Sequence, residues 1–119
     1  MPRFVAVYTM TRADLATFRA MPKADQDAAD AKGLAEWEAW DARHASSIVN
    51  AGGMVGKTTR ITRDGTIAPA TNDFCGYLVV EAETAEAAAA LFADHPHIST
   101  FPGDGIDIMP LLTGPDLEA

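Results

Sequence analysis

Cysteine is nearly absent from this 119-residue sequence, and long hydrophobic runs are absent altogether. The single cysteine, Cys75, cannot form an intramolecular disulfide, and its apolar neighbours in 74–80 predict a buried, inert thiol. The first apolar run, 4–8, is far too short for a signal-peptide core or a membrane span. We therefore expect a cytoplasmic protein that does not associate with membranes.

Positive charge is also scarce, since nine Lys and Arg stand against 17 Asp and Glu, for a formal net charge of −8. Such a surface repels phosphate backbones, so nucleic acid is not an expected partner. The sequence carries no P-loop, dinucleotide fingerprint or serine nucleophile elbow. Its three histidines, His44, His95 and His97, match no zinc-site spacing. We therefore predict neither a metal nor another cofactor.

The length fits one domain, and an apolar fraction of 48% is typical of a globular protein. We assign residues 1–112 to this domain and 113–119 to a C-terminal tail. A domain of this size buries only a little over 60% of its unfolded surface, by the usual scaling. Pairing of two copies is a common way to bury more.

Turn residues and hydrophobic periodicity divide the sequence into strands and helices. Pro22 is expected to end a first helix, Gly52 and Gly53 to close a long one, and Pro96 to end a third. Asp64-Gly65 predicts a two-residue hairpin turn. In chain order, we expect a strand at 3–10, a helix from 11, a helix-compatible stretch at 24–32, a helix at 34–48, a strand at 54–62, hairpin arms at 58–61 and 66–68, a strand at 74–81, a helix at 85–94 and a strand at 105–112.

This order of elements predicts an α+β fold, a ferredoxin-like split βαβ arrangement with an inserted β-hairpin. The strand at 74–81 is apolar on both faces, with Leu78 and Val80 on one side and Tyr77 and Val79 on the other. Helices can cover only one face, so a second copy of the sheet is the simplest cover for the other. The sequence thus predicts a homodimer.

Four segments, GGMV, TRITRDGTI, GYLVVEAETAEAAAALFADHP and GDGIDIMPL, resemble in this order the YCII-related family, including its DGPF-domain branch. The resemblance covers 1–112 and implies a dimeric α/β barrel, two sheets face to face with helices outside. Some YCII-like members carry a proposed catalytic pair, a histidine on the first long helix and an aspartate before the proline that ends the second. His44 matches the histidine, but His95 occupies the aspartate position, with Asp94 one residue earlier. Because His95 replaces that aspartate, the resemblance carries over no intact His–Asp mechanism. Where the DGPF branch has its Asp-Gly-Pro-Phe run, 69–74 keeps Phe74 and at most Asp73 besides.

Two histidine groups are candidate site features: His44 for proton transfer, and His95-Pro96-His97 for a metal site of three ligands together with His44 or Asp94. His44 follows Trp37 by seven residues and Trp40 by four, so the three share one flank of a helix. Proline after His95 favours extended backbone, so His95 and His97 can point to the same side. The alternatives are core or interface histidines, and a helix-ending turn whose imidazoles bond nearby carbonyls.

Asp107 lies between two isoleucines, and a carboxylate on an apolar strand face indicates a cavity or, alternatively, a solvated strand end. Trp37, Trp40 and Phe74 are either packing residues or walls for a ligand. We predict that the catalytic residues are His44, His95 and Asp107, and that the ligand-binding residues are Trp37, Trp40, Phe74 and His97.

The sequence favours a protein that binds a small aromatic or hydrophobic molecule in a cleft between sheet and helices, with cofactor-free acid–base chemistry. The alternative is a non-catalytic dimeric interaction or regulatory accessory module. A ligand cleft predicts polar groups that converge on a cavity, whereas an interaction module predicts a closed interior and an exposed apolar patch. The sequence leaves open whether the protein is an enzyme.

Overall fold

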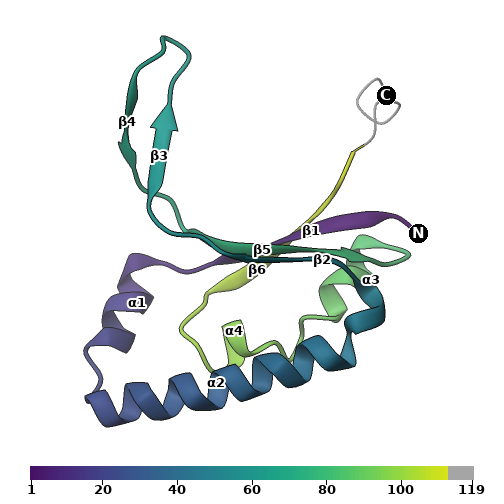
Figure 1. Cartoon of the computed structure of the whole chain (residues 1–119), viewed down its shortest axis with the longest axis horizontal. Coiled ribbons are helices and arrows are strands. Elements are labelled where there is room, and N and C mark those ends of the chain that lie inside the picture. Colours follow the sequence, from purple (N-terminus) through teal and green to yellow (C-terminus); the bar gives the residue numbers. More distant parts are fainter. Residues whose placement is uncertain (113–119) are drawn as a thin grey trace.

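The computed structural model describes residues 1–112, so the predicted tail at 113–119 lies outside the described residues. Its elements alternate much as the sequence predicts (Figure 1). In chain order they are β1 (Arg3–Thr9), α1 (Arg12–Arg19), α2 (Lys23–Arg43), the 3-10 turn η1 (Ala45–Ser47), β2 (Ile48–Met54), β3 (Thr58–Ile61), β4 (Ile67–Ala70), β5 (Phe74–Glu81), α3 (Ala85–Ala90), α4 (Pro96–Ser99) and β6 (Gly105–Pro110).

The main sheet has four antiparallel strands in the order β2-β5-β1-β6, which is the ferredoxin-like arrangement. All the helices lie on one face of this sheet, and β3 and β4 form a separate hairpin that rises on the other side (Figure 1). The predicted α+β class with an inserted hairpin is thereby confirmed. No helix within residues 1–112 is long and apolar enough to cross a membrane.

Strand alternation decides which side chains form the core. In β1, Phe4, Ala6 and Tyr8 point toward the helices and are buried, as Leu78 and Val80 are in β5. The opposite face of the sheet is also largely apolar but only half-buried. Its central residues are Val5, Val7, Cys75, Tyr77 and Val79.

The long helix α2 starts earlier and ends earlier than the sequence suggests. It runs unbroken through the alanine- and aspartate-rich stretch, with Pro22 at its N-cap and His44 at its C-cap. Pro22 therefore begins this helix, while the short helix α1 before it ends at Arg19. A proline tolerates a helix start because the first N–H groups have no helical partner.

Gly52 and Gly53 do not close the long helix, and that prediction was wrong. They lie inside β2, where the pairing with β5 shifts register between Asn50 and Gly53. Gly52 has a φ of 58°, and a Cβ there would lie 1.9 Å from the carbonyl oxygen of Tyr77. The glycine is thus required by a β-bulge and not by a helix cap.

The third predicted helix, at 85–94, is shorter in the structure. Helix α3 ends at Ala90, and Pro96 is the first residue of the short helix α4 instead of the end of the preceding one. Proline suits this position because its missing N–H would be unpaired there anyway. His95 consequently becomes the N-cap of α4.

Candidate functional site

The layer between α2 and the sheet holds an aromatic cluster centred on His95, which is completely buried. The ring of Trp37 lies edge-on to this imidazole, with centroids 4.4 Å apart, and the ring of Trp40 lies edge-on at 4.6 Å. Tyr8 approaches from β1, with its ring centroid 5.2 Å from that of His95. Trp40 is itself fixed by a hydrogen bond from its indole N–H to the carbonyl oxygen of Leu91, at 2.9 Å.

Hydrogen bonds determine which ring nitrogen of neutral His95 carries the proton. Its Nδ1 accepts from the backbone N–H of His97, at 3.0 Å, as an N-cap acceptor for α4. In a neutral imidazole the proton must then sit on Nε2, which lies 3.4 Å from the hydroxyl oxygen of Tyr8. His95 therefore holds α4 in place and presents a weak donor to Tyr8.

His97 is held by a different bond. Its Nε2 lies 2.8 Å from the carbonyl oxygen of Thr9, and a carbonyl can only accept, so Nε2 carries the proton. The Nδ1 of neutral His97 is then an unprotonated acceptor. Gly103 packs close to the same edge of the ring, where a Cβ would fall 2.2 Å from Nε2. The strand β1 and the loop before β6 thus clamp this imidazole.

Burial keeps this cluster neutral near pH 7. Desolvation, reinforced by the neighbouring His97, lowers the pKa of His95 to about 4. Burial also lowers the pKa of His97, although its bond to Thr9 opposes the shift. Desolvation raises the pKa of Tyr8, and the negative charge of Asp41 on α2 adds to the effect. Neutral imidazoles can accept a proton, and a protonated phenol can donate one.

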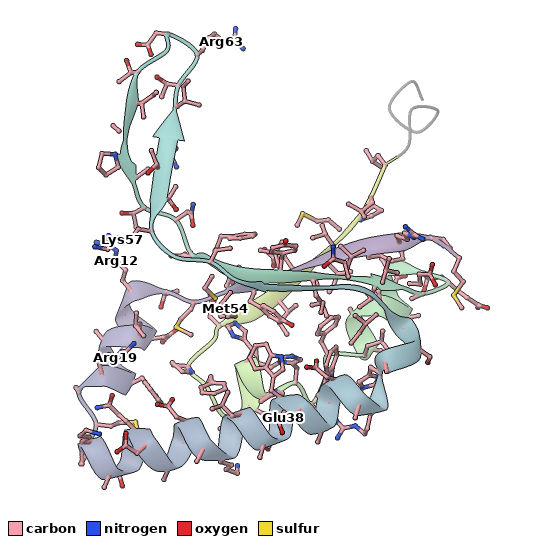
Figure 2. All side chains as sticks on the ribbon, viewed as in Figure 1. Arg12, Arg19, Glu38, Met54, Lys57 and Arg63 are labelled. Carbon is pink, nitrogen blue, oxygen red and sulfur yellow. The ribbon has the colours of Figure 1, made fainter. Side chains whose placement is uncertain are left out.

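A cavity of about 350 Å³ opens beside this cluster. Among the described residues of its lining, His97 and Trp37 carry ring nitrogens, and of these two only the imidazole of His97 can accept a proton. Met54, at the end of β2, extends below the sheet toward the helices at this place (Figure 2). The lining residues are Met10, Leu34, Trp37, Met54, His97 and Phe101.

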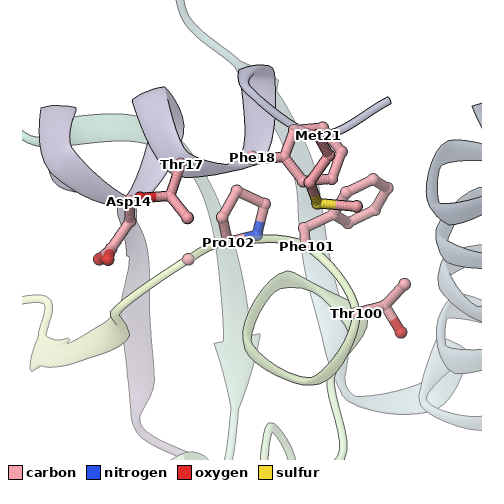
Figure 3. Close-up of a pocket in the computed structure, with 8 residues that line it drawn as sticks. Asp14, Thr17, Phe18, Met21, Thr100, Phe101 and Pro102 are labelled. Carbon is pink, nitrogen blue, oxygen red and sulfur yellow. The ribbon is translucent and has the colours of Figure 1, made fainter. Parts of the chain in front are cut away.

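Phe101 separates this cavity from a second hollow of about 300 Å³ between α1 and the loop at 100–103. Figure 3 shows this second hollow, with Asp14 and Thr17 on one side and Phe101 and Pro102 on the other. Gly33 makes room for the aromatic ring, since a Cβ there would lie 2.3 Å from the Phe101 ring. Glycine in the middle of α2 therefore serves the close approach of Phe101.

The structure brings five of the seven predicted site residues together. His44, half-buried at the end of α2, lies 4.7 Å from the Trp40 ring, and His95 lies 4.6 Å from the same ring. Trp37 contacts His95 and also lines the cavity. His97 contacts the same cluster through Tyr8, because the ring centroids of His97 and Tyr8 are 5.0 Å apart.

Asp107 and Phe74 do not join this group. Asp107 pairs with Val7 in the sheet, and its exposed side chain lies on the face away from the helices. The expected convergence of Asp107 with the two histidines therefore does not occur, because Ile106 and Ile108 take the helix-facing positions. Phe74 is 39% exposed and lines a separate pocket at the base of the hairpin.

The sequence reasoning missed Tyr8, Met10 and Phe101 as site residues. Tyr8 had a detectable signal, since it is the one hydrogen-bonding side chain on the buried face of β1. Phe101 and Met10 lie in or beside loops, where periodicity gives no orientation. Within residues 1–112, His, Cys, Asp and Glu side chains form no group of three or more that could hold a metal ion.

Comparison with protein-family models and with curated proteins finds no match. Among solved structures, the chain is similar to 5-chloro-2-hydroxyhydroquinone dehydrochlorinase from Burkholderia phenoliruptrix, in complex with 2,5-dihydroxybenzoquinone. The TM-score is 0.52 at 14% sequence identity, and the match covers 95% of this chain and 96% of that one. A similarity at this identity establishes a shared fold.

Proposed function

We propose that this protein binds a small, single-ring, mostly apolar molecule in the cavity beside His97, and that His97 accepts a proton from it. The observation that carries this proposal is a mostly apolar cavity that includes one clamped imidazole in its lining. Its volume of about 350 Å³ is at the small end of the range for ligand pockets. A ligand that fits would be one aromatic ring with few polar substituents.

The hydrogen bonds support this assignment of roles. The bond from Nε2 to Thr9 fixes the tautomer of His97 and leaves Nδ1 to receive a proton. His95 is the weaker candidate, because its Nδ1 is already engaged by the N–H of His97. We assign His95 a positioning role, together with Tyr8, and we assign Trp37 to the apolar wall.

The structural neighbour supports the ligand class. That protein is a dehydrochlorinase, and its bound ligand is a hydroxylated benzoquinone, a single ring. This similarity and the resemblance of residues 1–112 to YCII-related proteins together favour a YCII-like protein with cofactor-free acid–base chemistry. Both similarities concern the fold, so the assignment of the acid–base step rests on the geometry of the site.

Binding and chemistry are tested separately. Calorimetric titration with 4-chlorophenol should show saturable binding, and His97→Asn should weaken it by about tenfold, the value of one hydrogen bond to a site donor or acceptor. His44→Asn is the matched control, because His44 lies outside the lining. Chloride release from 5-chloro-2-hydroxyhydroquinone then tests the acid–base step. Binding without release would refute that step alone, whereas no binding would refute the proposal.

We propose further that a second copy of the chain covers the open face of the sheet. That face carries half-buried apolar side chains, and the hairpin rises on the same side (Figure 1). The hairpin presents a cross-strand pair, Ile61 and Ile67, that is 68% and 67% exposed. Sedimentation velocity at micromolar concentration should therefore give a dimer. A monomer mass at every concentration would contradict the barrel.

The same exposed face favours the second candidate function, a non-catalytic interaction module. Such a module needs the dimer or another partner on the open face and needs no ligand in the cavity. A stable dimer that binds neither 4-chlorophenol nor 5-chloro-2-hydroxyhydroquinone would support this candidate.

A further inference from the structure

The positive charges of this acidic protein are not evenly distributed in the structure. Four of the nine basic side chains, Arg3, Lys23, Lys32 and Arg43, form ion pairs with nearby carboxylates. The other five make no ion pair within residues 1–112. They all belong to α1 or the hairpin and its base, at one end of the molecule (Figure 2). They are Arg12, Arg19, Lys57 and Arg63, which Figure 2 labels, and Arg60 of β3.

Two of these cations border a pocket of about 270 Å³ at the base of the hairpin. Arg12 reaches it from the start of α1, and Lys57 reaches it from the segment between β2 and β3 (Figure 2). Pro69 and the 39% exposed ring of Phe74 give the pocket an apolar part. This pocket shares no lining residue with the cavity beside His97.

Hydrogen bonds hold the frame of this pocket. The guanidinium of Arg12 donates to the hydroxyl of Thr71, at 2.7 Å, which uses one of its five N–H donors. Asn72 ties the two arms of the hairpin together. Its amide donates to the hydroxyl of Thr58, at 3.1 Å, and its side-chain oxygen accepts from the N–H of Phe74, at 3.0 Å.

We propose that this pocket binds a small organic carboxylate, with the carboxylate on Arg12 and Lys57 and the apolar body against Phe74. A guanidinium matches a carboxylate with two parallel hydrogen bonds, and a lysine adds a mobile positive charge. Asp14, two residues after Arg12, and Asp73, between Asn72 and Phe74, make no ion pair with either cation. An anion meets repulsion from most of a chain of net charge −8, so this end is the favourable place for it.

The test uses sodium benzoate as the probe, and uncharged benzamide as a control of the same shape. In ¹H–¹⁵N spectra of the full chain, benzoate should shift the amide signals of residues 57–58 and 71–74 in a saturable way. Arg12→Gln and Lys57→Gln should each weaken benzoate binding by about tenfold, as expected for loss of a charge-assisted contact. Arg60→Gln is the matched control, because it removes the same charge from the same hairpin outside the pocket. It should change the affinity less than about twofold.

Several results would refute the proposed carboxylate site. They are equal binding of benzoate and benzamide, unchanged affinity in Arg12→Gln and Lys57→Gln, an Arg60→Gln effect as large as theirs, and tighter binding of inorganic phosphate than of benzoate. Shifts at Met10 and Met54 in place of 71–74 would also overturn it, because they would place benzoate in the cavity beside His97. The result is independent of the 4-chlorophenol titration, so either proposal can fail alone.

Discussion

Replacing His95 by asparagine should remove a large part of the acid sensitivity of this fold. The folded protein holds the pKa of His95 at about 4, whereas an unfolded histidine has a pKa near its ordinary value of 6.5. Between these values the unfolded chain binds more protons than the folded chain, so stability falls as the pH falls. The loss begins below pH 6.5 and reaches about 2.5 kcal/mol at pH 4.5.

Asparagine suits this test because its side-chain oxygen can still cap α4 while it carries no titratable group. Urea unfolding of the wild type, His95→Asn and a His44→Asn control should be measured at pH 7.5 and pH 4.5. The packing loss among Trp37, Trp40 and Tyr8 destabilises His95→Asn by a similar amount at both pH values, so it cancels from the comparison between them. The quantity of interest is the change with pH, which should shrink by about 2.5 kcal/mol in His95→Asn only. An equal pH dependence in wild type and His95→Asn would refute the assignment of His95 as a buried neutral imidazole.

Three further predictions concern packing. Gly52→Ala should destabilise the protein by at least about 2 kcal/mol in urea unfolding, because it adds a Cβ 1.9 Å from a backbone oxygen at a φ of 58°. Gly53→Ala is the control, since its Cβ meets nothing within 4 Å. Equal effects of the two substitutions would contradict the bulge. Gly33→Ala should also destabilise the protein, by about 1–3 kcal/mol, because the Phe101 ring must move to make room for the new Cβ. This cost exceeds the gain from the better helix propensity of alanine. A gain in thermal stability would contradict the contact between Gly33 and Phe101. Cys75 should react slowly with a thiol reagent, because burial raises the pKa of its half-buried thiol; labelling as fast as in denaturant would contradict its placement.

Patterns repeated along the chain predicted the fold well. The alternation in 74–80 and the helix expected from residue 11 are local signals with counterparts in the structure. Asp64-Gly65 correctly predicted a hairpin, but the N–H of Gly65 donates to the carbonyl oxygen of Thr62, so Arg63 and Asp64 are the central turn residues instead of the predicted pair. The predicted helix ends were wrong where one residue type is common in two different structural positions. Gly52 suits both a helix end and a β-bulge, and Pro96 suits both the end and the start of a helix, so only tertiary contacts distinguish them.

The candidate site was less predictable, because it depends on which strand face meets the helices. Asp107 was expected to join the histidines, but the register of β1 with β6 places it opposite Val7 on the other face. A shift of one residue would have reversed this outcome. His95 and His97 could be predicted because Pro96 between them indicates a turn. Phe101 could not, because its ring packs into the space beside Gly33 on α2, which exists only in the folded protein.

The ligand cavity beside His97 is the central claim, and the methionines of this chain test it directly. With ¹³C-labelled methionine methyl groups, addition of 4-chlorophenol should shift the signals of Met10 and Met54, which line the cavity. Met1 and Met109 lie outside the lining and should stay unchanged. Shifts confined to Met109, or no saturable shift at Met10 and Met54, would contradict the account.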